Sequence, residues 1–432
     1  MAMVVKNNMS AISTLNTLNK NSSALSKSLE KVSSGMKING AADDASGYAI
    51  SERMRVQIRS LDQDKANTQN GNSMMKVAEG AVSSTVEILK TLKEKVVNAA
   101  NATNTDADRA TIQKELDQSI DQIDDNANVT FNGQYLVDGS HNSKVAATTT
   151  TFTNTSMSTA TASGSAITDL ANRNGEKLHI NSSDTVTISY VVQGKTTTTS
   201  MTVSNKAFSD IIALASGGLS GTVGAGSIIG TDTSANTVYT ASGESGVSLY
   251  AKGTGTDNQV SGVTISITDN TGKVNKSANA VLDAFSESVR AQNDSADNAI
   301  VLQVGTKASQ SIKVGLTDMR STALGLKGTD GATLSVGTQA KANAAINVLD
   351  NAVQKALDQQ TTIGAVESRL DYTATNLTTA SENVQSSEST IRDADMAKEM
   401  TEYTKNNVLL QAAQSMLAQA NQNSSSVLSL LK

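Results

Sequence analysis

The C-terminal stretch MAKEMTEYTKNNVLLQAAQSMLAQANQNSSSVLSLLK, residues 396–432, decides how the chain is interpreted. Steps of four and three residues from Met396 define one row, which is the heptad pattern of a helix that packs along one side. The row contains Met396, Met400, Tyr403, Asn407, Leu410, Gln414, Leu417, Asn421, Ser424, Leu428 and Leu431. It is only half apolar, and a solitary helix of this kind is marginal in water because its stability comes mainly from packing. The stretch therefore needs a partner.

The first forty residues predict a matching helix. Its row contains Val4, Asn8, Ala11, Leu15, Leu18, Ser22, Leu25, Leu29, Val32 and Met36. Two such helices present too little apolar width to be stable alone, so we interpret residues 1–40 and 390–432 as subunit-contact helices that order fully only in an assembly. The contact residues that we predict are Leu15, Leu18, Leu25, Leu29, Val32, Leu410, Leu417, Leu428 and Leu431. The alternative is a two-helix stalk within one chain.

Four motifs carry a resemblance to bacterial flagellin. The runs IRDADMAKEM (residues 391–400) and QSMLAQAN (414–421) resemble the C-terminal signature of that family, and INGAADDASG (38–47) and ISERMR (50–55) resemble the N-terminal one. The resemblance covers about residues 1–143 and 298–432, with the signatures in the family's order at opposite ends. It implies a structural subunit that polymerises with itself into the flagellar filament for swimming motility, with its terminal helices forming the filament core.

The same resemblance implies a location and partners. Flagellins leave the cell through the flagellar export apparatus and assemble outside it, so we expect an extracellular protein. An export chaperone and the filament cap protein are the expected flagellar partners. A hook–filament junction protein of related build is one alternative, and a surface adhesin that acts through the middle of the chain is another.

Composition excludes several other classes of function. The formal charge is −6, from 35 Lys+Arg and 41 Asp+Glu, which argues against nucleic-acid or membrane-surface binding. No apolar run approaches the ~20 residues of a membrane span, and residues 1–10 lack the layout of a signal peptide. The chain has no Cys, and its two histidines, His141 and His179, lie far apart. Without a nucleotide, metal or nucleophile motif, we predict no cofactor, no metal and no enzyme activity.

Inside the two ends, the sequence predicts a mainly α fold. Heptads over residues 75–99, 112–127 and 342–391 indicate an antiparallel helical bundle built from residues 41–143 and 298–389. Thr105 and Asp108 have the spacing of a capping box at a helix start. Alternating apolar residues over 300–304 and 312–316 predict a β-hairpin that packs on the bundle.

Three arginines, Arg53, Arg55 and Arg59, lie on the first helix of the bundle. From the pattern alone they are a solvated helix face. The family resemblance instead implies contacts between neighbouring subunits, where such charges would set register and salt sensitivity.

Residues 144–297 differ in character and predict an inserted, surface-exposed variable domain of mostly-β or α+β fold. Residues 186–192 and 196–203 form a predicted hairpin around the turn at 193–195, and residues 263–267 with the following turn at 269–272 predict another hairpin. Residues 278–290 favour a helix. Residues 145–165 are rich in Thr, Ser and Ala, which is typical of a linker.

The run LKTLKEKVVNAAN, residues 89–101, resembles the segment by which many flagellins engage the host flagellin-sensing Toll-like receptor. The resemblance implies candidate receptor contacts at Leu89, Thr91, Leu92, Lys93, Glu94 and Lys95. In the family pattern an Arg commonly stands at the position of Thr91 and a Leu at that of Lys95. Because Arg supplies a planar, multi-donor anchor that Thr lacks, we expect weaker recognition. The plain alternative is that Lys90, Lys93 and Lys95 only solvate this helix face.

Overall fold

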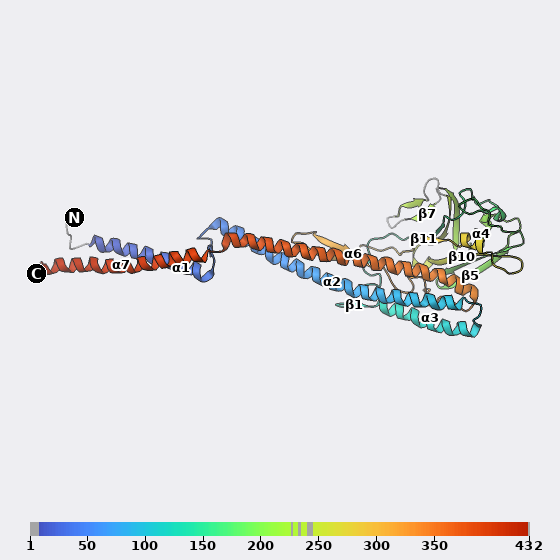
Figure 1. Cartoon of the computed structure of the whole chain (residues 1–432), viewed down its shortest axis with the longest axis horizontal. Helices are drawn as coiled ribbons and strands as arrows, with labels where there is room; N and C mark the ends of the chain where they lie inside the picture. Colours follow the sequence, from blue (N-terminus) through green and yellow to red (C-terminus); the bar gives the residue numbers. More distant parts are fainter. Residues whose placement is uncertain (1–7, 226–227, 232–234, 240–244, 431–432) are drawn as a thin grey trace. The chain divides into compact units, whose positions relative to one another are not determined.

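The computed structural model describes residues 8–225, 228–231, 235–239 and 245–430 (Figure 1). The chain divides into two compact units. Unit 1 contains Met1–Thr68, Gln303–Gln310 and Tyr372–Lys432, and unit 2 contains Gln69–Leu302 and Ser311–Asp371. The division into terminal helices, bundle and insert stays a prediction.

The fold is mainly α, as predicted. The helices are α1 (Met9–Ser34), α2 (Ala45–Ala99), α3 (Asp106–Ala127), α4 (Phe208–Leu214), α5 (Lys276–Leu282), α6 (Gln339–Arg392) and α7 (Met396–Leu430), with short 3-10 turns at Ile167–Asp169 and Thr256–Asn258. The predicted capping box begins α3: the Thr105 hydroxyl accepts from the Asp108 backbone N–H (3.3 Å) and the Asp108 carboxylate accepts from the Thr105 backbone N–H (2.9 Å). α1 ends at Gly35, whose left-handed backbone (φ 72°) lets its N–H bond the Lys31 carbonyl.

In unit 2, α2, α3 and α6 share a core. The buried residues that follow the predicted heptads are Met75, Val82, Leu89, Leu92 and Val96 of α2, Leu116, Ile120 and Ile123 of α3, and Leu349, Ala356 and Ile363 of α6. Ion pairs join the rims of the helices, from Lys93 to Asp350 and from Lys95 to Glu115 (2.9 Å). Each buried Leu or Ile contributes about 1.5–3 kcal/mol relative to exposure, so this packing holds the helices together.

Two small hairpins belong to this part of the chain. β1 (Thr130–Phe131) pairs with β2 (Gln134–Tyr135), and β12 (Ile300–Gln303) pairs with β13 (Ser311–Val314). The second is the hairpin that the alternating pattern predicted. It reaches α2, because a Cβ added to Gly71 would lie 2.8 Å from Leu302 Cδ1.

The insert is an α+β domain, as predicted, with antiparallel sheets. Its strands are β3 (Thr151–Asn154), β4 (Thr185–Val192), β5 (Lys195–Thr202), β6 (Leu219–Ala225), β7 (Ile228–Thr231), β8 (Thr237–Tyr239), β9 (Ser245–Ala251), β10 (Val260–Thr268) and β11 (Ser286–Val289). They form sheets of order β10-β4-β5, β11-β3-β9-β6 and β7-β8. The β4–β5 pair is the predicted hairpin, closed by Gln193 and Gly194 at positive φ.

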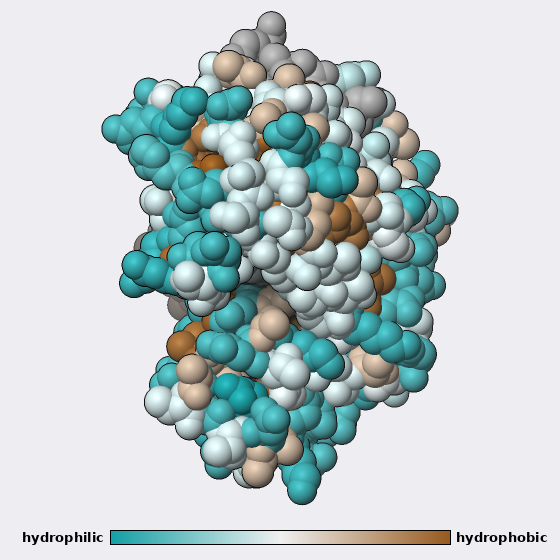
Figure 2. Space-filling view, turned by 90° about the vertical axis from the view of Figure 1, so that its right-hand side faces the viewer, coloured by the Kyte–Doolittle hydropathy of each residue, from teal (hydrophilic) through white to brown (hydrophobic). Residues whose placement is uncertain are grey.

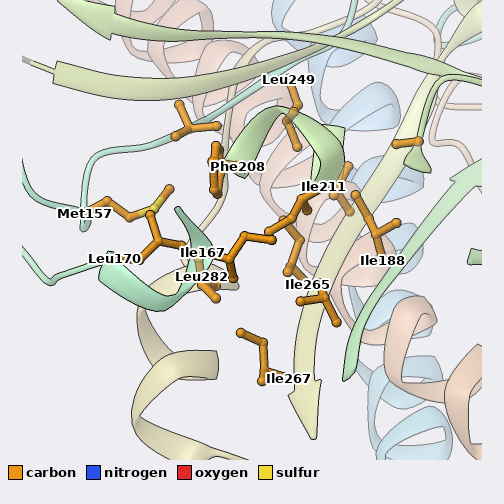
Figure 3. Packing of buried hydrophobic residues seen from close by; sticks show 14 of the residues in the cluster. Met157, Ile167, Leu170, Ile188, Phe208, Ile211, Leu249, Ile265, Ile267 and Leu282 are labelled. Atoms are coloured by element: carbon orange, nitrogen blue, oxygen red, sulfur yellow. The ribbon is translucent and has the colours of Figure 1, made fainter. Parts of the chain in front are cut away.

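The core of the insert gathers apolar side chains from both larger sheets and both short helices (Figure 3). Phe208 and Ile211 of α4 lie in this cluster with Ile188 of β4 and Leu249 of β9. Figure 2 shows the end of the molecule at the right-hand side of Figure 1, where the surface is mainly teal and white and brown is confined to small areas.

Two local predictions within the insert are wrong. Residues 145–165 are not a linker, because β3 lies between β11 and β9 and its Phe152 is buried. The helix predicted over residues 278–290 ends at Leu282, and its second half is β11. Asp283 follows the helix end, and its carboxylate accepts a hydrogen bond from the Ile265 backbone N–H (3.1 Å). Both errors arise because partners more than a dozen residues away decide the local structure.

The insert packs directly on α6 within unit 2. A Cβ on Gly262 of β10 would lie 2.9 Å from Val348 Cγ2, so the strand approaches the helix closely. Asn347 donates to the Val263 carbonyl (3.1 Å), and Asn351 donates to the Ser261 carbonyl (2.9 Å). α6 thus has the bundle on one side and a sheet of the insert on another.

We expect the same substitution at two glycines of α2 to have opposite effects. Gly71→Leu should lower the free energy of unfolding by about 1–3 kcal/mol, because the new side chain must displace Leu302. Gly80→Leu should raise it by about 0.5–1 kcal/mol, because Gly80 is exposed with nothing near its Cβ and Leu favours helix. Urea unfolding followed by circular dichroism measures both; equal effects would contradict the packing of β12 on α2.

Candidate subunit-contact surface

The helices at the two ends of the chain, α1 and α7, pair with each other in antiparallel fashion in unit 1. Polar contacts follow the pair along its length: Asn8 donates to the Ala420 carbonyl (3.2 Å), Asn21 to the Leu409 carbonyl (3.2 Å) and Asn406 to the Ser28 hydroxyl (2.9 Å). Lys31 and Glu399 form an ion pair of 3.7 Å near the chain reversals, which are the segment between α1 and α2 and the segment between α6 and α7. These polar contacts therefore set the register of the pair, and of the side chains that make them only Asn8 belongs to a predicted row.

Part of each predicted row is partly buried, and the rest of the row is exposed. The partly buried positions of α1 include Leu18, Leu25 and Val32, and those of α7 include Leu410 and Leu417. The buried residues of the pair are small, Ser28 and Ala413. The contact between the helices is consequently narrow.

The rest of the apolar surface stays exposed in the chain. Leu15 and Leu29, both predicted contact residues, are 45% and 52% exposed. Met9 and Ile12 of α1 and Met396, Met400, Val408, Leu409 and Met416 of α7 are exposed as well. Exposed large apolar side chains at this density mark a surface that another protein covers. Of the remaining predicted contacts, Leu431 and the Leu428 side chain lie outside the described residues.

A buried arginine joins the two chain reversals beside this helix pair. Arg392, at the end of α6, is 5% exposed and donates to Glu52 Oε1 of α2 (2.6 Å), and its guanidinium lies 5.4 Å from the centre of the Tyr48 ring. Backbone bonds reinforce the contact, from the Lys37 N–H to the Arg392 carbonyl (2.7 Å) and from the Ala394 N–H to the Gly35 carbonyl (2.9 Å). The motifs ISERMR and IRDADMAKEM thus meet in space. Residue pattern alone did not single out Arg392, although it lies within the second motif.

The three arginines proposed as intersubunit contacts differ in their surroundings. Arg55 forms ion pairs with Glu52 (3.5 Å) and with Glu388 of α6 (3.4 Å), so its charge is used within the chain. Arg53 and Arg59 are exposed, and neither forms an ion pair with a residue that the structure describes. The latter two are the ones available to a neighbouring molecule.

The six candidate receptor residues on α2 also separate by burial. Leu89 and Leu92 are fully buried core residues and are not presented at the surface of the chain. Lys93 and Lys95 are half-buried and paired with acidic residues of α6 and α3, as described above. Thr91 and Glu94 are exposed.

Among the described residues, no group of three His, Asp or Glu side chains is arranged to hold a metal ion. No described helix is both long and apolar enough to span a membrane.

Comparisons with known proteins identify the family of the chain. The model of the bacterial flagellin N-terminal helical region matches residues 5–142, and that of the C-terminal helical region matches residues 346–431. A flagellin of Clostridium tyrobutyricum is 35% identical over 97% of this chain and 99% of its own length. The chain belongs to the bacterial flagellin family. As a flagellin it is a structural subunit of a flagellar filament, as the resemblance implied.

Other relatives that align with the whole chain are also flagellar filament proteins. A flagellin of Bacillus subtilis (strain 168) is 30% identical, with both chains covered in full. The flagellar filament 33 kDa core protein of Treponema phagedenis is 28% identical with the same coverage. The hook–filament junction and adhesin alternatives are therefore not favoured.

Solved structures of other flagellar proteins are similar to this chain only at low sequence identity and low TM-score. FliC from Burkholderia pseudomallei is 18% identical, with a TM-score of 0.26 over 69% of this chain and 99% of that one. The flagellar hook associated protein-3 of Legionella pneumophila is 15% identical, with a TM-score of 0.34 over 78% and 97%. At these scores the likenesses do not distinguish a flagellin from a junction protein, whereas the sequence relatives do.

The ion pair between Arg392 and Glu52, called the clamp below, predicts that the stability of unit 1 depends on pH. The hydrogen bond from Arg392 holds the pKa of Glu52 below its ordinary value of 4.5. A carboxylate with a lowered pKa stabilises the folded chain fully above that ordinary value and loses this contribution as pH falls through the lowered pKa. Glu52→Gln should therefore destabilise unit 1 at neutral pH and remove part of its acid sensitivity.

Thermal melting of Glu52→Gln and of wild type between pH 3 and pH 7 measures this response. Glu87→Gln is the matched control, because Glu87 pairs with Lys90 on the same helix face only three residues away. If the melting temperatures of Glu52→Gln and wild type changed in parallel between pH 3 and pH 7, that result would contradict a role for the clamp.

Proposed function

We propose that α1 and α7 are the surfaces through which copies of this flagellin polymerise, so that the paired terminal helices form the core of the filament. The observation that carries the proposal is the set of large apolar side chains that stay exposed on both helices although the helices pair with each other. A second copy would cover these side chains, which removes apolar surface from water at about 25 cal/mol per Å². Because a filament is an open helical assembly, the contacts are head-to-tail rather than two-fold.

The remaining parts take complementary roles in this proposal. Arg53 and Arg59 contact the neighbouring subunit, and their contribution falls with rising salt because surface charge pairs are screened. Residues 41–143 and 298–389 form the wall around the core, and the insert, residues 144–297, faces outward. The chain leaves the cell through the flagellar export apparatus with an export chaperone, and the cap protein receives it at the growing tip. The role is structural and involves no catalysis.

Two leucines provide the test of the proposed core. Leu29→Asp should abolish seeded polymerisation while leaving the α1–α7 pair intact, because Leu29 points away from that pair. Leu417→Asp should abolish polymerisation and also loosen the pair, because Leu417 is half-buried against α1. Sedimentation and negative-stain microscopy measure polymer, and circular dichroism measures helix content.

Leu29→Met is the matched control and should polymerise like wild type, since it keeps an apolar side chain of similar size. Both aspartate variants should keep the melting of unit 2, whose core contains neither leucine. Normal filaments from Leu29→Asp would refute the proposed core. A purified wild-type chain that never extends filament seeds would instead favour a junction protein.

We also propose that the exposed part of residues 89–101 engages the host flagellin-sensing Toll-like receptor, with Thr91 and Glu94 as surface contacts. Their exposure on α2, beside the exposed Lys90, supports this narrower set. Thr91 bonds the Glu87 carbonyl of its own helix (3.0 Å) and offers one hydroxyl, whereas Arg would offer a multi-donor fork.

Thr91→Arg should accordingly strengthen binding to the receptor ectodomain by roughly tenfold, the equivalent of one charge-assisted contact. Surface plasmon resonance with wild type, Thr91→Arg and the control Thr111→Arg, an exposed threonine of α3, measures the change. Unchanged binding of Thr91→Arg, or an equal gain in the control, would contradict the proposed contact.

A further inference from the structure

Four Asn-Gly dipeptides occur in the chain, beginning at Asn39, Asn70, Asn132 and Asn174. Asparagine is a chemically labile residue, and it deamidates most readily before glycine, which has no side chain to hinder the backbone nitrogen. That nitrogen attacks the side-chain amide of the asparagine, so the reaction needs a free glycine N–H and a backbone that can rotate. The surroundings of each dipeptide therefore decide which of them reacts in the folded chain.

Three of the four dipeptides are held away from the reactive arrangement. The Gly40 N–H donates to the Asp43 carboxylate (3.3 Å), and the Gly175 N–H donates to the Asn172 carbonyl (3.0 Å). Gly71 lies inside the long helix α2, where its N–H belongs to the helical hydrogen-bond ladder. The need to break one such bond slows the reaction by roughly two- to tenfold. Opening the interior of α2 slows it further.

The fourth dipeptide forms the turn of the β1–β2 hairpin. Phe131 pairs with Gln134 across it, and Asn132 and Gly133 both have positive φ (51° and 80°), as a type I′ turn requires. Within the part of the chain that the structure describes, the Gly133 N–H donates no hydrogen bond. Asn132 and Gly133 are both exposed. The nitrogen that must react is therefore free and open to water.

The β1–β2 hairpin is also short enough to open locally. Each of its strands has two residues, and a two-stranded hairpin is at best marginally stable by itself in water. The attack requires the ψ angle of Asn132 to leave the turn conformation, and local opening of the hairpin permits this rotation. No comparable freedom exists inside α2, whose helix continues on both sides of Gly71.

We propose that Asn132 is the site at which the folded chain deamidates first, because its turn leaves the Gly133 N–H free. The Gly133 nitrogen loses its proton to hydroxide and attacks Asn132 Cγ, so that a C–N bond forms. The side-chain nitrogen takes a proton from water and leaves as ammonia. Water then opens the resulting succinimide ring at either carbonyl, which gives aspartate or isoaspartate. The net reaction consumes one water and releases one ammonia, and it needs no oxidant, reductant or enzyme.

The two products differ in their effect on the hairpin. Aspartate fits the turn, because Asp-Gly is also a preferred type I′ pair. Isoaspartate adds a methylene to the backbone of the turn, so Phe131 and Gln134 lose their register. The fully buried Leu136 follows β2, and the bond from its N–H to the Val129 carbonyl (3.3 Å) is weakened by the same change. All of these residues belong to unit 2, so the reaction does not depend on polymerisation.

Peptide mass spectrometry of the purified full chain, aged in mildly alkaline buffer and then digested, measures deamidation at each dipeptide over time. Folded wild type should react at Asn132 roughly two- to tenfold faster than at Asn39 or Asn174, with Asn70 the slowest. In urea the four rates should become similar, because all four glycine N–H groups are then free. Chromatography of the Asn132 peptide should resolve two products, aspartate and isoaspartate.

Asn132→Gln should stop the reaction at this position, because the longer side chain would have to close a larger ring, and it should leave the other three rates unchanged. Asn174→Gln is the matched control and should keep the wild-type rate at Asn132. A rate at Asn132 no higher than the other three in the folded chain would overturn the proposal. The same excess at Asn132 in urea would overturn it too, because the turn would then play no part.

Discussion

Two helices side by side cannot cover each other's full apolar surface, and this limit governs both ends of the chain. α1 and α7 pair through one row each, fixed in register by Asn21, Asn406 and the other polar contacts, and they leave Leu15, Leu29 and several methionines in solvent. In unit 2, by contrast, α6 has α2 on one side and β10 of the insert on another. We therefore propose that the ends depend on additional copies of the chain, whereas unit 2 contains its own core.

The segment between α1 and α2 and the segment between α6 and α7 contact each other within one chain. Arg392 is buried against Glu52 and Tyr48, and backbone bonds join residues 35–37 to residues 392–394. A buried cation is costly without partners, so this contact fixes one arrangement of the reversals rather than adding much net stability. The signatures at opposite ends of the sequence thereby become neighbours within unit 1.

Regular spacing made much of this fold predictable. The heptads of α2, α3 and α6, the Thr105–Asp108 capping box and the β4–β5 hairpin all follow from local patterns that the structure confirms. The heptad rows of the terminal helices were also predicted, but the sequence could not say which residues of each row face the partner helix. A heptad pattern predicts a contact face on a helix and does not identify the helix that covers each residue of that face. Leu18 and Leu29 belong to the same predicted stripe, yet only Leu18 faces α7.

The failures share one physical cause, which is dependence on distant residues. β3 is a buried strand because β9 and β11 lie on either side of it, although its own Thr-rich sequence is typical of a linker. The segment after Leu282 is a strand because β3 pairs with it and because Asp283 bonds the β10 backbone. Burial raises the pKa of Asp283 to about 6, a consequence that no sequence pattern would indicate.

Amide hydrogen exchange of the full chain, measured as monomer and as filament, tests the central claim most directly. The account predicts that amides of α1 and α7 exchange rapidly in the monomer and become strongly protected in the filament, while buried segments of α2, α3 and α6 in unit 2 are protected in both states. Equal and strong protection of α1 and α7 in the monomer would contradict it, because the terminal pair would then be stable without a second copy.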